Sequence, residues 1–296
     1  MTLHEFVQQC INGLSLGSTY ALLSLGLAML FSIMGLINFA HGELLTIGGY
    51  VMWTLLHHET SWWLVVPATL LATTLAAVAM ERIAFRPLRG ASIVTLLITS
   101  FAISYFIQVA FQIFVNTAPE GIPLPNWVNN TVAVFGTHIP DVKLVTFGVT
   151  ILAVVLLNVF LRRTTLGVSI RAAAEDFQVV RLMGIHADWV VAAAFALSGL
   201  LAGIAALLFF ATTAAVDPGS GVPLVIAAFI GAILGGLGNL TGAVIGGFAL
   251  GIVTELFEAN LHGTLSQFSD AFALAGVIAI LLLRPQGLVG RTAGLT

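Results

Sequence analysis

RRTTLGVSIRAAAEDFQVVRLMGIHADW, residues Arg162–Trp189, is the only long polar passage in an otherwise apolar chain. It holds seven of the chain's 23 charged residues. Apolar sequence extends on both sides of it, over residues 1–161 and 189–296. The polar segment 162–188 therefore separates an N-terminal and a C-terminal group of hydrophobic segments.

The composition indicates a membrane protein. Of 296 residues, 59% are hydrophobic and 8% are charged, whereas soluble domains average roughly 25% charged residues. The mean hydropathy is +1.07. Because a membrane-spanning helix takes about 20 residues, the sequence predicts an all-α, polytopic integral membrane protein with about eight to nine transmembrane helices. We expect one transmembrane domain, without a soluble catalytic domain.

Two runs without Asp, Glu, Lys or Arg are too long to be single membrane-spanning helices. Residues 6–42 and 218–254 each contain 37 residues, which would extend about 55 Å as one helix, against a hydrocarbon core of roughly 30 Å. We expect the first run to break near Gly35–Asn38 and the second within Gly235–Gly242. Each break predicts either a broken helix or a re-entrant segment.

The other apolar stretches are separated by loops whose charges indicate a topology. The expected spans, apart from the two halves of the second run, are Asn12–Ile33, a segment through His41 and Glu43 to His57, Leu64–Met80, Ser92–Val115, Leu144–Leu161, Val190–Thr212 and Ser266–Leu283. Nine of the ten basic residues fall on one side, with Lys143 the exception. Because basic loops stay in the cytoplasm, we expect nine passes, a cytoplasmic C-terminus and an external N-terminus. A re-entrant segment in place of one pass would put the N-terminus inside. The loop Asn116–Asp141 is expected to be external.

Within the polar passage, Ser169–Met183 has the periodicity of one amphipathic helix. One face of this helix is apolar and is formed by Ile170, Ala173, Phe177 and Val180. Another face is polar and is formed by Arg171, Glu175 and Gln178. Gly184 follows as a C-terminal stop. A helix this short must pack on the membrane surface or on a partner protein. Anionic head groups would repel its acidic residues, which favours a protein partner.

The motifs of common enzymes are absent from the sequence. The one lysine, Lys143, lies in no glycine-rich phosphate-binding motif, so any ATP hydrolysis would belong to another chain. The single cysteine, Cys10, excludes an intrachain disulfide and a multi-cysteine metal site. We expect no catalytic residue, metal or cofactor in this chain.

Polar residues near the two breaks are candidates for a solute pathway. His41 and Glu43 are placed about two turns inside a predicted span, where ionisable groups are costly and face either a pathway or a partner. A hydrogen bond that ties the broken backbone to a neighbouring helix explains them equally well, and glycines near the breaks can equally serve close packing. The candidates for the solute pathway are Asn38, His41, Gly42, Glu43, Gly236, Gly238 and Asn239.

Five blocks of sequence stand out: GLINFAHGE at Gly35–Glu43, ERIAFRPLR at Glu81–Arg89, RAAAEDFQVVRLMGI at Arg171–Ile185, GGLGNLTGAVIGG at Gly235–Gly247 and RPQGLVG at Arg284–Gly290. In this order they resemble the LivH-type permease subunit of branched-chain amino-acid ABC importers. Together they extend over nearly the whole chain. Gln286 departs from the small residue expected in the last block. Related permeases carry branched-chain or other amino acids, urea or short amides, and aromatic acids.

The resemblance implies an assembly in the bacterial inner membrane. Its other members would be a LivM-type sister permease or a second copy of this chain, two cytoplasmic ABC ATPases that hold ATP and magnesium, and a periplasmic substrate-binding protein. No nucleic acid is implied. The family's cytoplasmic coupling segment maps onto Arg171, Glu175, Asp176, Arg181 and Gly184.

A second hypothesis comes from the residues alone. Glu43 could be the coupling carboxylate of an ion-driven secondary transporter that works without an ATPase. Such a protein would lose uptake in the presence of an uncoupler.

Overall fold

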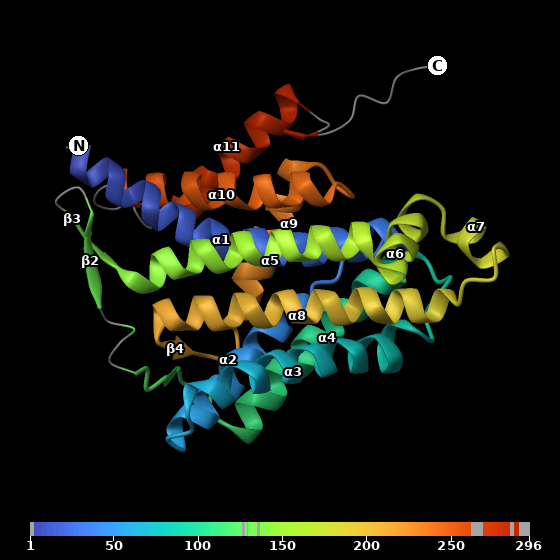
Figure 1. Cartoon of the computed structure of the whole chain (residues 1–296), viewed down its shortest axis with the longest axis horizontal. Coiled ribbons are helices and arrows are strands. Elements are labelled where there is room, and N and C mark those ends of the chain that lie inside the picture. The colour runs from blue at the N-terminus through green and yellow to red at the C-terminus, as the bar shows by residue number, and fades with distance from the viewer. Residues whose placement is uncertain are drawn as a thin grey trace.

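The computed structural model describes residues 3–125, 128, 130–134, 137–261, 269–284 and 287–289. Its helices are α1 (Leu3–Met34), α2 (His41–His57), α3 (Trp62–Met80), the π-helical turn η1 (Glu81–Phe85), α4 (Ile93–Phe114), α5 (Asp141–Arg163), α6 (Thr165–Glu175), α7 (Phe177–Leu182), α8 (Ala187–Thr213), α9 (Gly221–Gly235), α10 (Leu240–Asn260) and α11 (Ser269–Leu283). The long helices lie roughly side by side, with α6 and α7 at one end of the bundle (Figure 1). We call this the α6–α7 end.

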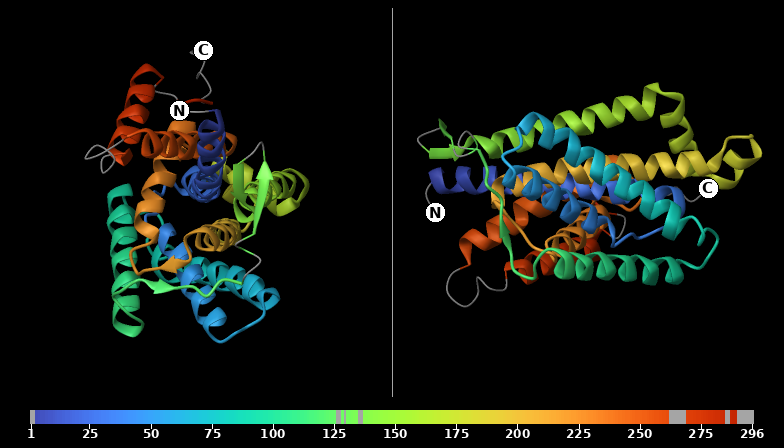
Figure 2. Two further views of the ribbon diagram at one scale, coloured as in Figure 1. Left: turned by 90° about the vertical axis from the view of Figure 1, so that its left-hand side faces the viewer. Right: turned by 90° about the horizontal axis from the view of Figure 1, so that it is seen from below.

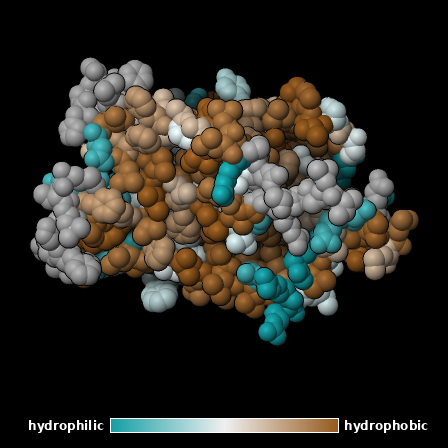
Figure 3. Space-filling model, turned by 90° about the horizontal axis from the view of Figure 1, so that it is seen from above, coloured by the Kyte–Doolittle hydropathy of each residue, from teal (hydrophilic) through white to brown (hydrophobic). Residues whose placement is uncertain are grey.

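The prediction of a polytopic membrane protein is confirmed. In the described part of the chain, six helices are long and apolar enough to cross a membrane: α1, α3 with η1, α4, α5, α8 and α10. Three shorter helices of the bundle, α2, α9 and α11, have 17, 15 and 15 residues. At 1.5 Å per residue, α2 and α9 are about 25 and 22 Å long, less than a hydrocarbon core. Hydrophobic side chains cover most of the face seen in Figure 3.

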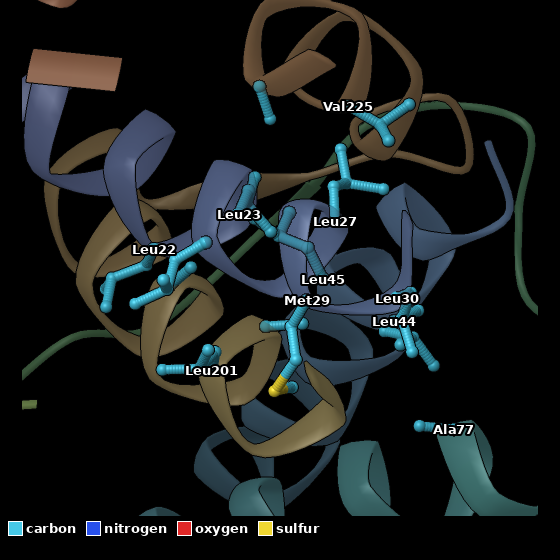
Figure 4. Close-up of a cluster of buried hydrophobic side chains, with 14 of the residues drawn as sticks. Leu22, Leu23, Leu27, Met29, Leu30, Leu44, Leu45, Ala77, Leu201 and Val225 are labelled. Carbon is cyan, nitrogen blue, oxygen red and sulfur yellow. The ribbon is translucent and has the colours of Figure 1, made fainter. Parts of the chain in front are cut away.

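Helix α1 forms the centre of the bundle and packs against α5, α8, α9 and α10. Its leucines meet side chains of α2, α8 and α9, among them Leu45, Leu201 and Val225 (Figure 4). Glycines allow the closest approach to α10, because a Cβ at Gly17 would lie 2.9 Å from the Phe248 Cα atom. Small residues that let helix backbones approach are the usual basis of packing in lipid, where apolar burial gives no driving force between helices.

Both predicted breaks are present. In the first charge-free run, α1 ends at Met34, and Gly35 then adopts a φ of +63°. In the second run, α9 ends at Gly235, and Gly236 adopts a φ of +107°. Left-handed backbone of this kind favours glycine because a Cβ would clash.

The polar passage differs from its prediction, because the single helix Ser169–Met183 is wrong. Helix α6 begins earlier, where the Thr164 hydroxyl accepts a hydrogen bond from Gly167 N (3.0 Å), and it ends at Glu175. Asp176 is extended, with φ −152° and ψ 101°, and its Oδ1 accepts from Val179 N (3.0 Å). An aspartate that caps the next helix cannot continue the previous one. Gly184, with a φ of +79°, does end the segment.

Two predicted loops contain regular structure. The Asn116–Asp141 loop includes β1 (Glu120–Gly121), β2 (Thr131–Val134) and β3 (Thr137–Pro140). Strands β2 and β3 form a hairpin, and β1 pairs antiparallel with β4 (Ala215–Val216), which follows α8. The basic loop between the predicted spans Leu64–Met80 and Ser92–Val115 contains Arg82, Arg86 and Arg89, and its first half is the π-helical turn η1 (Glu81–Phe85). Strand β1 therefore joins the connections that follow α4 and α8.

The basic loop and the polar passage are in contact. Their basic residues predicted that both would lie on the same side of the membrane. Arg86 Nη2 contacts Asp188 Oδ2 at 2.7 Å, and Arg89 also pairs with Asp188. Asp188 is in the first turn of α8, near the end of the polar passage. The chain after α11 returns to the end of α9, where Leu288 N donates to Leu234 O (2.7 Å).

Candidate functional site

The pathway candidates of the first break lie together in the interior. Asn38, His41 and Glu43 are all fully buried. His41 is the first residue of α2 and Glu43 the third, so this helix begins later than the predicted span, which placed them about two turns from its start. Residues 35–38 are not helical, and α2 starts only after the chain has turned. The break is therefore longer than glycine position alone suggested.

Glu43 joins α2 to α4. Its Oε1 accepts hydrogen bonds from the Ser104 hydroxyl (2.7 Å) and from Gln108 Nε2 (2.9 Å). Ser104 and Gln108 are one helical turn apart on α4 and also contact each other at 3.0 Å. Buried carboxylates are costly unless they are hydrogen-bonded, and this pair of donors satisfies one oxygen of Glu43.

His41 joins α2 to α8. Its Nδ1 lies 3.2 Å from the Ser198 hydroxyl. Its Nε2 is buried and has no hydrogen-bond partner, and the same holds for Oδ1 of Asn38, whose Nδ2 is 3.8 Å from the Met80 sulfur. The first break thus combines polar groups that tie α2 to its neighbours with polar atoms that are left unpaired.

The N-termini of the two short helices meet at this level. Gly42, in the first turn of α2, packs directly on Gly221, the first residue of α9, and a Cβ on either glycine would overlap the other's carbonyl group. Thr46 Oγ1 lies beside Gly221 as well. Each helix N-terminus carries a partial positive charge. Two such termini converge here among buried polar side chains.

The pathway candidates of the second break lie elsewhere and form a turn at the α6–α7 end. Gly236 and Gly238 have φ values of +107° and +85°. Asn239 caps α10, since its Oδ1 accepts from Gly242 N (3.1 Å), and its Nδ2 donates to Val289 O (3.1 Å). All three line a cavity together with Arg162 and Arg171. The structure thus brings together the first four pathway candidates, but not these three with them.

The five coupling candidates are all exposed at the α6–α7 end. Arg171 differs from the others because its Nε donates to Leu161 O (3.0 Å) and so turns back toward α5. Helix α7 extends beyond the ends of the long helices (Figure 1). Its apolar residue Leu182 and the adjacent Met183 are 86% and 72% exposed.

Sequence reasoning missed Ser104, Gln108 and Ser198 as partners of the first break. Ser104 and Gln108 carry a readable signal, because two polar residues four positions apart occupy one face of an apolar helix. Nothing in the sequence indicates that this face meets Glu43, which lies 61 residues before Ser104.

The chain matches the family described as branched-chain amino acid transport system, permease component, over residues 9–283. It belongs to this permease family. A high-affinity branched-chain amino acid transport system permease protein of Pseudomonas aeruginosa, BraD, is 36% identical over 98% of the chain and 97% of its own length. LivH of Escherichia coli strain K12, which has the same description, is 34% identical over 97% of the chain and 96% of its own length. The resemblance stated from the five blocks is confirmed.

The family match extends to distant organisms. A probable branched-chain amino acid transport permease protein LivH of Methanocaldococcus jannaschii is 30% identical over 91% of the chain and 88% of its own length. No solved structure matches the chain. As a member of this family the chain is a multi-pass membrane permease component and not an ATPase.

Proposed function

We propose that this permease moves branched-chain amino acids inward as the membrane subunit of an ABC importer in the bacterial inner membrane. The observation that carries the proposal is near-full-length identity of 34–36% to BraD and LivH. The partners we propose are a sister permease of the LivM type, two cytoplasmic ATPases with ATP and magnesium, and a periplasmic binding protein.

We propose that the ATPases dock on the coupling segment, residues 171–184. Glu175, Asp176 and Arg181 are exposed, and Leu182 and Met183 add apolar surface at the same tip. An exposed apolar patch rimmed by charge is typical of a protein interface. Asp188 follows this segment and pairs with Arg86 and Arg89, so a push on α7 would reach both α8 and the turn after α3.

We propose that the solute passes the first break. The N-termini of α2 and α9 would favour the carboxylate of an amino acid, as discontinuous helices do in other transporters. The contact of Gly42 with Gly221 closes this point, and alternating access would separate the two helix ends. Unpaired atoms of Asn38 and His41 support the assignment, because such atoms are costly without a partner. The turn at Gly236–Asn239 has no part in this route.

We propose that the α6–α7 end is cytoplasmic. Among the residues that the structure describes, eight of the nine basic residues belong to segments at this end, with Lys143 the exception, as expected from the charge rule for short loops. The hydrogen bond from Leu288 N to Leu234 O holds the segment after α11 at the same end, which supports a cytoplasmic C-terminus. Helix α1 would then begin outside.

Purification of the tagged chain from its native membrane tests this assembly. Mass spectrometry of the material extracted in mild detergent should find two P-loop ATPases per pair of permease chains. Isolation of the chain alone, in a form that transports in liposomes without ATP, would instead support the ion-coupled transporter with Glu43 as its coupling carboxylate.

A further inference from the structure

A cavity of about 1200 Å³ opens between α5 and the α9–α10 turn at the α6–α7 end. Its floor includes Leu25 of α1, which packs against both α5 and α10. The two views of Figure 2 show how these helices are arranged around α1. Pockets for small molecules are usually about 300–1,000 Å³. This cavity is larger than a single amino acid requires.

The lining is divided into a basic polar end and an apolar wall. The polar end has the side chains of Arg162 and Arg171, with Asn158 and Asn239 beside them. The apolar lining includes Val154 and Leu157 of α5 and Val244 and Ile245 of α10. No acidic side chain lines the cavity in the described part of the chain. The groove therefore suits a ligand that is anionic at one end and apolar along its length.

Both arginines are positioned to bind an anion. Arg162 lies in the last turn of α5, where a spanning helix reaches the membrane surface. Arg171 lines the cavity and is held by its bond from Nε to Leu161 O (3.0 Å), which does not use its two terminal nitrogens. Among the described residues, neither arginine takes part in an ion pair.

The neighbouring surface is suited to lipid. On α5, Val155 and Leu156 are exposed next to the groove-lining residues, and on α10 Ile245 is both exposed and part of the wall. Basic pockets between transmembrane helices on the cytoplasmic side bind anionic lipid head groups. If a sister permease filled this groove, its acidic side chains would be expected to pair with the two arginines. A phospholipid instead supplies both a phosphate for the arginines and acyl chains for the apolar wall.

We propose that this groove binds an anionic phospholipid, with its phosphate between Arg162 and Arg171 and an acyl chain along Leu157 and Ile245. The lipid would connect α5 and α6 to the α9–α10 turn. It would thereby hold the start of the coupling segment against the bundle. The site is independent of the solute route.

The test measures lipid binding by the purified, delipidated complex. Phosphatidylglycerol should bind, and should raise the melting temperature, more than phosphatidylcholine does. Native mass spectrometry should show about 30-fold weaker phosphatidylglycerol binding for the Arg162→Gln/Arg171→Gln double variant, given roughly 1 kcal/mol per basic residue. The matched control is Arg163→Gln, which changes an exposed adjacent arginine that does not line the cavity and should leave binding unchanged.

A second variant tests the apolar wall. Ile245→Trp places a bulky ring in the groove at a position that is 44% exposed, and should also weaken phosphatidylglycerol binding. Three results would overturn the proposal. They are equal loss in Arg163→Gln, equal stabilisation by inorganic phosphate alone, or dissociation of the sister permease from the double variant with lipid affinity unchanged.

Discussion

Glu81, only 1% exposed, forms an ion pair with Arg89. Arg89 in turn pairs with Asp188, and Arg86 contacts the same carboxylate at 2.7 Å. These contacts connect the end of α3 to the start of α8, immediately after the coupling segment. The two arginines differ in one respect that can be tested: Arg89 neutralises a buried carboxylate, and Arg86 contacts only an exposed one.

Arg89→Ala should therefore destabilise the protein much more than Arg86→Ala. Removal of Arg89 leaves Glu81 buried and unpaired, a loss of about 3–5 kcal/mol. Exposed pairs such as that of Arg86 contribute about 0–1 kcal/mol. Melting temperatures of both variants in detergent, with size-exclusion chromatography as the readout of unfolding, check this difference. Similar melting temperatures would contradict it.

Gly42→Val should lower stability by forcing α2 and α9 apart. Any Cβ at this position overlaps the carbonyl group of Gly221, and overpacking of this kind costs about 1–3 kcal/mol. The control is Gly148→Ala in α5, where an added Cβ meets no atom within 4 Å. Thermal melting should separate the two variants, and a Gly42→Val protein as stable as the control would show that the two helix ends are not in contact.

Glu43→Gln should slow transport without changing its energy source. The glutamine still offers an oxygen to Ser104 and Gln108, so the link between α2 and α4 persists. Glu43→Ala removes the acceptor and should cost about 1–3 kcal/mol of stability. Uptake measured with and without ATP and a protonophore tests this. Loss of energisation by an ion gradient in Glu43→Gln would favour the secondary transporter.

Ala174→Pro should abolish transport and leave membrane insertion intact. Proline at Ala174, in the last turn of α6, removes the helical hydrogen bond to residue 170 and clashes with its carbonyl group, at a cost of about 3 kcal/mol. Thr165→Pro is the control, because the first residue of a helix tolerates proline and Thr164 before it is already extended. Uptake by cells with equal amounts of each variant in the membrane gives the comparison. Normal uptake with Ala174→Pro would refute the coupling role of α6.

The sequence predicted those features that depend on chain length and local chemistry. A charge-free run too long for one helix had to break, and Gly35 and Gly236 are where it does. The end of the first helix in the polar passage was less predictable. The helical spacing of Ile170, Ala173 and Phe177 continues past Asp176, so the sequence pattern predicts one helix there. In the structure Asp176 instead caps a second helix.

The contacts of the candidate site depend on packing between distant segments. Glu43 meets Ser104, and Gly42 meets Gly221, only because the helices cross at those points. A single sequence contains no information on which faces meet. It could identify the residues at the first break as unusual, but it could not assign their partners.

The central claim is that this chain transports branched-chain amino acids with energy from partner ATPases. It is tested most directly by leucine uptake into proteoliposomes that contain the purified complex, with ATP enclosed and the binding protein outside. We predict uptake that requires both ATP and the binding protein and that persists in the presence of a protonophore. Uptake by this chain alone, without ATP and abolished by the protonophore, would contradict the account.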